Sequence, residues 1–241
     1  MLNSPRMDLA PRGAHSSYFF GEEAMNFEQA RFNMVEQQIR TWGVVDPGVH
    51  QLLMAVRRED FVPPSMRSLA FADIEIPLSG GQVMLRPSIE GRILQAIGTH
   101  HVNSVLEVGT GSGYFAALLA VNADRVHTVE IDPEMAQFAR DNLARNGVAN
   151  VSVEDGDASQ GWYTQAPYDV IVVSGGLPEL PEALALQLKP GGRLFAFTGS
   201  PPAMKACLIS RNDKKTLPHL VLFETVVPML RHIPQAPAFN F

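Results

Sequence analysis

Apolar residues follow two different periods along the chain, and the change between them comes near residue 100. Before that point they recur every three or four residues, which predicts helices with one buried face. After it, short runs rich in β-branched residues alternate with helical stretches, a pattern typical of a parallel sheet covered by helices. The sequence therefore predicts an α/β fold with a helical cap at 25–99 and a sheet domain at 100–241.

The cap pattern predicts three helices separated by a loop-rich segment. The first covers 27–42 and is ended by Gly43, and the second begins after Asp46, a good N-cap residue. Prolines and glycines at 71–87 predict loops, and a third helix follows at 88–97. We expect these helices to lie against the sheet domain.

The sheet domain is predicted to contain five parallel strands joined by right-handed crossovers. The strand-like runs are at 104–108, 125–130, 151–154, 168–173 and 193–197, and the helical intervals are at 114–121, 133–146 and 181–188. Two later runs, KACLIS and HLVLFETVV, predict antiparallel strands at the edge of the sheet.

The first 24 residues differ from the rest of the chain. They mix proline, glycine and serine and lack the apolar run of a secretory signal. We expect a disordered extension there, and the sequence leaves open whether translation begins at Met1 or at Met25, where the amphipathic pattern starts.

Composition excludes several classes of protein. Hydrophobic residues make up 46% and charged residues 18% of the chain, as in ordinary globular proteins, and no run is apolar enough to span a membrane. A net charge of −6 disfavours nucleic acid as a partner. The single cysteine, Cys207, fits a reducing compartment, so we expect a cytoplasmic protein. The histidines show no zinc-like spacing, so we assign no metal, and nothing indicates the oligomeric state.

A glycine-rich turn follows the first strand of the sheet domain. The strand SVLEV runs directly into Gly109, Thr110, Gly111 and, two positions further on, Gly113, where backbone N–H groups at a helix start can bind an anionic group. Glu107 would repel a pyrophosphate but attract an ammonium, and the GxGxG spacing differs from that of dinucleotide sites. Both features favour a ligand that carries an amino acid, although a structural turn or a nicotinamide or flavin site remains an alternative.

Acidic residues follow the next two strands. Glu130, followed by Ile131, closes the second strand about 20 residues after the glycine turn, where a carboxylate can accept hydrogen bonds from ribose hydroxyls. Asp157 and Ala158 follow the third strand and can contact an adenine ring through the Asp157 carboxylate and a backbone N–H. The alternatives are a solvated charge at Glu130 and a conformational turn at Asp157.

Together, EVGTGSG, Glu130, DGDA and LKPGGRL resemble the class I S-adenosylmethionine-dependent methyltransferases. The resemblance implies a Rossmann-like, mostly parallel twisted sheet with helices on both faces. It also implies S-adenosyl-L-methionine as the cofactor, bound by the residues of the glycine turn and of the two acidic segments.

Over 27–231 the chain resembles the protein-L-isoaspartate O-methyltransferase family more narrowly. The resemblance is carried by FNMVEQQIRTWGVVDPGV, VRREDFVPP, PLSGGQ, YDVIVVSGGLPELPEALALQLKPGGRL and FETVVPML. It implies methylation of the carboxylate of isoaspartyl residues, the first step of a protein repair that proceeds through a succinimide. The implied partner is a protein or peptide that contains isoaspartate.

The chain departs from this family where substrate is expected to bind. The family continues its Gly-Gln with Thr-Ile-Ser, whereas here Gln82 is followed by Val83, Met84, Leu85 and Arg86, which removes two hydroxyl groups. We expect Gln82, Val83, Leu85 and Arg86 to line the substrate site, with Arg86 either clamping a carboxylate or remaining in solvent. Because a carboxylate is already ionised near pH 7, no general base is required, and no catalytic residue is assigned.

Two other functions stay open. The apolar Val83 and Leu85 are compatible with a methyltransferase that acts on a different acceptor, such as a small molecule or another protein group. They are also compatible with a cofactor-binding adaptor or sensor that has no isoaspartyl activity. Methylation of nucleic-acid amino groups is disfavoured, because SGGLPE follows the fourth strand in place of the Asn/Asp-Pro-Pro-aromatic turn of such enzymes.

Overall fold

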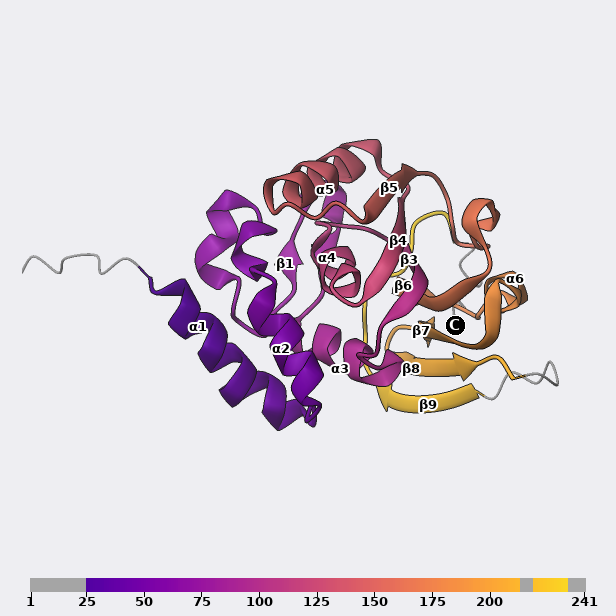
Figure 1. The fold of residues 1–241 in the computed structure, drawn as a ribbon, viewed down its shortest axis with the longest axis horizontal. Coiled ribbons are helices and arrows are strands. Elements are labelled where there is room, and N and C mark those ends of the chain that lie inside the picture. The colour runs from indigo at the N-terminus through magenta and orange to yellow at the C-terminus, as the bar shows by residue number, and fades with distance from the viewer. Residues whose placement is uncertain (1–24, 213–218, 234–241) are drawn as a thin grey trace, which may run out of the picture.

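The structure of the chain, a computed structural model, describes residues 25–212 and 219–233 (Figure 1). The expected disordered extension at 1–24 lies outside these residues. Figure 1 shows the first cap helices on one side of a twisted sheet and the last two strands together at one edge of it, at the bottom of the view.

The first cap helix is confirmed, although its geometry changes along its length. Helix α1 (Phe27–Asn33) continues as a π-helix (Met34–Ile39) and a 3-10 turn (Arg40–Trp42). Gly43 ends it in the left-handed conformation, with φ 79°. Of the predicted apolar stripe, Met34, Val35 and Ile39 are buried and belong to a core that includes other cap residues.

The remaining cap elements include a short hairpin. Asp46 accepts a hydrogen bond from the Gly48 N–H and caps α2 (Pro47–Ala55), as predicted. The other elements are 3-10 turns at Arg58–Asp60, Pro64–Leu69 and Ser79–Gly81, strands β1 (Ile76–Pro77) and β2 (Val83–Met84), and α3 (Pro87–Ile97). The antiparallel β1–β2 pair gives the predicted loop-rich segment a fixed shape. We call residues 78–86 the hairpin loop.

The seven-stranded sheet confirms the predicted fold class. Its strands, in spatial order β5-β4-β3-β6-β7-β8-β9, are parallel from β5 to β7, and β8 and β9 add antiparallel edge strands. Their bounds are β3 Val102–Val108, β4 Ala123–Glu130, β5 Val151–Asp155, β6 Tyr168–Leu177, β7 Leu188–Ser200, β8 Ala203–Ser210 and β9 His219–Glu224.

Helices cover both faces of the sheet, because successive side chains of a strand point to opposite sides. Val105 of β3 belongs to a core that includes α4 (Tyr114–Ala120), residues of α5 (Pro133–Arg145) and the cap. Leu106 belongs to the core on the other face, with α6 (Glu182–Leu186). Within the described residues, no helix is both long and apolar enough to cross a membrane.

The structure differs from the predicted boundaries at β6 and α6. Strand β6 continues past the expected end at residue 173 to Leu177, because Gly175 and Gly176 leave room for a C-terminal segment against it. Helix α6 ends at Leu186, and Leu188 already belongs to β7, since the Gln187 carbonyl accepts the Tyr168 N–H at the start of the strand pair.

Candidate functional site

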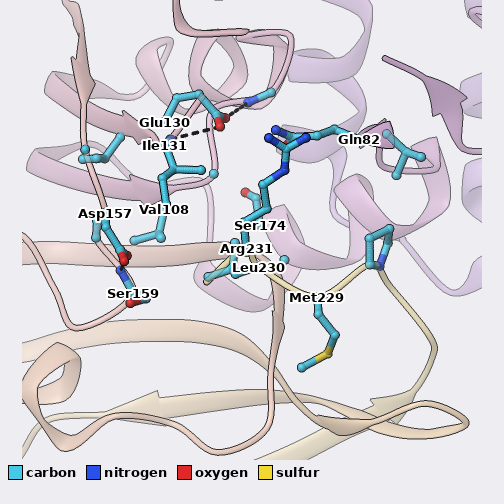
Figure 2. A pocket seen from close by; sticks show the side chains of 18 of the residues that line it. Gln82, Val108, Glu130, Ile131, Asp157, Ser159, Ser174, Met229, Leu230 and Arg231 are labelled. Carbon is cyan, nitrogen blue, oxygen red and sulfur yellow. Dashed lines mark hydrogen bonds between the residues drawn. The ribbon is translucent and has the colours of Figure 1, made fainter. Parts of the chain in front are cut away.

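A pocket of about 190 Å³ opens at the carboxyl ends of β3, β4 and β6 (Figure 2). This is the edge where parallel α/β sheets bind ligands. Besides the strand ends, five segments far apart in the sequence meet there: the hairpin loop, the glycine turn, the segment after β4, the segment after β5, and residues 228–231. The lining residues are Gly81, Gln82, Val83, Leu85, Val108, Gly109, Gly111, Val129, Glu130, Ile131, Gly156, Asp157, Ala158, Ser159, Ser174, Gly175, Pro228, Met229, Leu230 and Arg231.

The glycine turn contributes two of its four predicted residues to the pocket wall. Gly109 and Gly111 line the pocket, with φ 93° and 53°, a region that favours glycine. Thr110 is buried and shares a 2.7 Å hydrogen bond with the hydroxyl of Thr128. Gly113 lies at the start of α4, where an added Cβ would come within 3.3 Å of the Ala139 Cβ on α5. Gly113 thus allows the two helices to pack closely.

Glu130 ties the glycine turn to the end of β4. Its carboxylate is buried and accepts the Gly111 N–H at 3.0 Å through Oε2. The other oxygen, Oε1, accepts the backbone N–H groups of Ile131 at 3.0 Å and Asp132 at 3.2 Å. These bonds fix the carboxylate at the pocket wall beside Ile131, and Figure 2 shows two of them as dashed lines.

Glu107 lies in a smaller cavity that adjoins the pocket. It is fully buried, and its carboxylate accepts hydrogen bonds from Thr128 Oγ1 at 2.7 Å and Ser174 Oγ at 3.1 Å. Burial raises its pKa to about 8. The cavity also contains Glu90 and shares Val83, Leu85, Gly109, Gly111 and Ser174 with the main pocket. The two compartments are therefore in direct contact.

The turn after β5 carries Asp157 and Ala158 into the pocket. Asp157 Oδ1 accepts the Ser159 N–H at 2.9 Å, so the carboxylate shapes its own turn, and Ala158 is buried. Behind the turn, the Trp162 indole would lie within 2.8 Å of a Cβ at Gly156 and donates to Glu154 Oε2 at 2.8 Å. This packing holds the turn in place.

The hairpin loop brings three of its four predicted residues to the pocket. Gln82, Val83 and Leu85 line it, and the Nε2 atom of Gln82 is buried without a hydrogen-bond partner. Arg86 instead precedes α3 and reaches Thr225 Oγ1 at 3.4 Å, away from the pocket wall. The apolar pair Val83 and Leu85 therefore forms part of the pocket wall.

The sequence interpretation missed Ser174, Gly175 and residues 228–231, which also line the pocket. Residues 228–231, which we call the C-terminal strap, bind β6 through Gly176 N–H to Pro228 O at 2.8 Å and Leu230 N–H to Gly176 O at 2.9 Å. The two glycines in SGG were the available signal, because a strand glycine often marks a close approach of another backbone.

The described residues contain no cluster of three or more His, Cys, Asp or Glu side chains arranged to hold a metal ion. The charged side chains that line the pocket are two acids, Glu130 and Asp157, and one cation, Arg231. Apolar walls at Val108 and Ile131 lie beside the acids. This combination suits a positively charged ligand with a flat apolar part.

Comparison with known proteins agrees with this geometry. Residues 29–226 match the family model for protein-L-isoaspartate(D-aspartate) O-methyltransferase. Protein-L-isoaspartate O-methyltransferase 1 of Rhodopseudomonas palustris strain HaA2 is 43% identical over 179 residues, which are 74% of this chain and 73% of that protein. The protein of the same name from Koribacter versatilis is 38% identical over 213 residues, which are 88% and 96% of the two chains.

Solved structures show the same fold. A structure of a protein-L-isoaspartate O-methyltransferase aligns with a TM-score of 0.71 at 26% identity, covering 84% of this chain and 65% of that one. A Plasmodium falciparum protein, provisionally described as a member of the same family and solved with S-adenosyl-L-homocysteine, aligns with a TM-score of 0.70 at 18% identity, covering 86% and 99%. Because the family model and the two relatives cover most of the chain, this protein belongs to the protein-L-isoaspartate O-methyltransferase family, whose members use S-adenosyl-L-methionine.

Proposed function

We propose that this chain methylates the carboxylate of isoaspartyl residues in proteins or peptides, with S-adenosyl-L-methionine as methyl donor. The proposal rests on one observation: in a chain of this family, the Gly111 N–H donates a hydrogen bond to Glu130 and so joins the glycine turn to the end of β4 at the pocket wall. The predicted cytoplasmic location is part of the same proposal, because damaged intracellular proteins would be the substrates.

The residues that line the pocket suit this cofactor in charge and in polarity. S-adenosyl-L-methionine carries a sulfonium and an ammonium against one carboxylate, and the pocket is lined by two acids and one cation. In this proposal Glu130 would accept from the ribose hydroxyls, and Ile131 would offer an apolar surface to the adenine. Asp157 and the Ala158 N–H would contact the adenine edge.

The methionine part of the cofactor would lie along the glycine turn. The backbone of Gly109, Thr110 and Gly111 borders this end of the pocket, and Glu107 lies directly behind it in the adjoining cavity. Gly113 would act indirectly, by allowing α4 and α5 to pack. In this arrangement the hairpin loop would border the end of the pocket where methyl transfer takes place.

When bound, the cofactor supplies an electrophilic methyl group on sulfur. The acceptor carboxylate needs no proton removed, since its reference pKa is about 4, so the protein's task is to orient and to exclude water. Transfer would form an O–CH₃ bond as the S–CH₃ bond broke, and the electron pair of the broken bond would remain on the cofactor's sulfur. Val83 and Leu85 would exclude water from the acceptor oxygen, and Gln82 offers the unpaired Nε2 donor beside them.

Methyl transfer to peptides tests the proposal directly. The chain is incubated with methyl-labelled S-adenosyl-L-methionine and either an isoaspartyl peptide or the matched aspartyl peptide. We expect a labelled methyl ester on the isoaspartyl peptide alone. Cofactor binding without transfer to that peptide would contradict the proposed acceptor.

Glu130→Gln tests the cofactor site separately. The amide keeps one acceptor oxygen but loses the charge, so we expect binding of S-adenosyl-L-homocysteine to weaken roughly 10- to 100-fold. Glu134→Gln, in the exposed first turn of α5, is the matched control and should bind normally. Equal affinity of the two variants would remove Glu130 from the proposed site.

A methyltransferase with a different acceptor is the second candidate. The observation that favours it is the pair Val83 and Leu85 in the pocket wall, which replaces two hydroxyls by apolar groups. A screen of carboxylate and other acceptors would identify such an activity. Tight cofactor binding with no turnover on any acceptor would instead support an adaptor or sensor.

A further inference from the structure

Two arginines hold the hairpin loop from opposite ends. Arg58 is fully buried, pairs with Glu90 and donates from Nη2 to the Leu85 carbonyl at 2.7 Å. Arg231 donates to the Gly80 carbonyl and pairs with Asp132 Oδ2 at 3.0 Å. One guanidinium therefore binds the last part of the loop and the other its first part.

The C-terminal strap brings Arg231 to the pocket. Residues 228–230 lie directly on β6, where a Cβ at Gly175 would come within 2.7 Å of Leu230 Cδ2. Leu230 also packs against the glycine turn, 3.5 Å from the position of a Cβ at Gly109. The strap is thus fixed along one wall of the pocket, and Figure 2 shows the Arg231 side chain extending from it toward Gln82.

The backbone of the hairpin loop is shaped to receive this side chain. Gly80 adopts φ 62°, and a Cβ there would lie only 2.5 Å from Arg231 Nη2. A larger residue would be strained and would displace the guanidinium. The contact therefore depends on both Gly80 and Arg231.

Asp132 connects the other side of Arg231 to the cofactor site. It follows Glu130 and Ile131, which line the pocket, and its Oδ1 caps α5 by accepting the N–H groups of Glu134 and Met135. The Arg231–Asp132 pair thus links the hairpin loop to the segment proposed to bind ribose.

The two anchors differ in exposure. The Arg58 side chain is 0% exposed, whereas that of Arg231 is 37% exposed and its partner Asp132 19%. Ion pairs in contact with water are weak and are screened by salt, so they open far more readily than buried ones. The Arg231 anchor is the one that can release the loop.

We propose that Arg231 is a positioning residue that fastens the hairpin loop over the cofactor and sets how fast the cofactor leaves. The proposal rests on the proposed function, because it takes the pocket to be the S-adenosyl-L-methionine site. The buried Arg58 keeps its end of the hairpin loop in place, whereas breaking of the Arg231 contacts opens the other end for cofactor exchange.

The test measures binding and dissociation of S-adenosyl-L-homocysteine without any acceptor present. For Arg231→Gln we expect dissociation and Kd to rise roughly 5- to 20-fold while the Tm stays within about 2 °C. Arg231→Lys should fall between, because an ammonium cannot reach both partners with a planar fork. Added salt should speed dissociation from the unaltered chain but not from Arg231→Gln.

Two further variants separate this role from a general structural one. Asp132→Asn keeps the helix cap but removes the charge, and combining it with Arg231→Gln should cost no more than Arg231→Gln alone. Lys189→Gln is the matched control, because Lys189 also forms a partly exposed ion pair: its Nζ lies 2.8 Å from Asp169 Oδ2, and the two side chains are 30% and 27% exposed. Asp169 accepts the backbone N–H groups of Asn103 and Ser104, at the end of the strands opposite the pocket. That variant should leave dissociation unchanged.

Unchanged dissociation from Arg231→Gln would overturn the proposal. The proposal would also be overturned if Arg231→Gln bound S-adenosyl-L-homocysteine normally and only its KM for the isoaspartyl peptide were raised. Arg231 would then recognise the acceptor. Failure of the unaltered chain to bind S-adenosyl-L-homocysteine at all would overturn the proposed function instead, so the two failures are distinguishable.

Discussion

At Leu85 the chain has an apolar side chain where the family resemblance implies a serine hydroxyl in the substrate site. Leu85 is nearly buried and lines both the main pocket and the cavity behind it. Leu85→Ser restores a hydroxyl, and we expect kcat/KM for an isoaspartyl peptide to rise roughly 10-fold, because a hydrogen bond to a charged group contributes about 1.5–3 kcal/mol. Kinetics with matched peptides measures this.

Leu85→Ala is the control, because it removes a similar volume without adding a donor. Both variants should lose stability, by about 2–4 kcal/mol, since a buried leucine side chain is removed. Equal activity of the serine and alanine variants would mean that the missing hydroxyl is not what limits turnover.

Glu107 gives a prediction for pH. Burial raises its pKa to about 8, so between its ordinary value of 4.5 and about 8 the folded chain holds a proton that the unfolded chain releases. The free energy of unfolding should therefore fall as the pH rises through this window, by at most about 1.4 kcal/mol per pH unit. Glu107→Gln mimics the neutral carboxyl and should remove this contribution. Denaturation at about pH 6 and about pH 7.5 compares the slopes, and parallel slopes would contradict the prediction.

At the scale of elements, the Arg58–Glu90 pair joins the turn after α2 to α3. Arg58 also donates from Nε to the Ala70 carbonyl at 2.9 Å, and its guanidinium lies 4.9 Å from the centre of the Tyr114 ring on α4. Arg58→Met leaves Glu90 buried without its partner, and we expect a loss of about 3–5 kcal/mol in the free energy of unfolding. Chemical denaturation measures it.

The neighbouring arginine provides the control for that substitution. The Arg57 side chain is 58% exposed, so Arg57→Met should change stability by less than about 0.5 kcal/mol. Combining Arg58→Met with Glu90→Leu should recover part of the loss, because no uncompensated charge then remains. A double variant that is less stable than Arg58→Met would argue against this explanation.

Most of these elements could be predicted from the sequence because their signals are local. Asp46 marks the start of its helix, and Glu130 the end of β4, through capping and periodicity alone. The arrangement of Arg231 across the pocket could not be predicted in this way. It depends on Gly176, 55 positions earlier, and on Gly80, 151 positions earlier, and such distant backbone contacts leave no periodic signal. The sequence thus indicated the cofactor side of the pocket better than the side that covers it.

At the scale of the whole molecule, cap and sheet domain share one hydrophobic core. Helix α4 reads YFAALLA and is buried on every side, with all of its residues at most 6% exposed. A helix that is apolar all round needs neighbours on all faces. The sheet covers one side of α4, and the core that encloses it contains cap residues such as Phe61, whose ring lies 5.6 Å from that of Tyr114.

This shared core predicts that residues 100–241 alone will not form a stable domain. Without the cap, α4 would expose buried side chains such as Phe115 and Leu118. Each buried apolar side chain contributes about 1.5–3 kcal/mol to the free energy of unfolding. The loss of several such contributions would equal the whole stability of a typical domain, about 5–15 kcal/mol. We expect the fragment to show no cooperative thermal transition by circular dichroism and no binding of S-adenosyl-L-homocysteine, whereas residues 25–241 show both. A fragment that unfolds cooperatively would mean that the sheet and its helices suffice for folding, and that the cap serves the acceptor site alone.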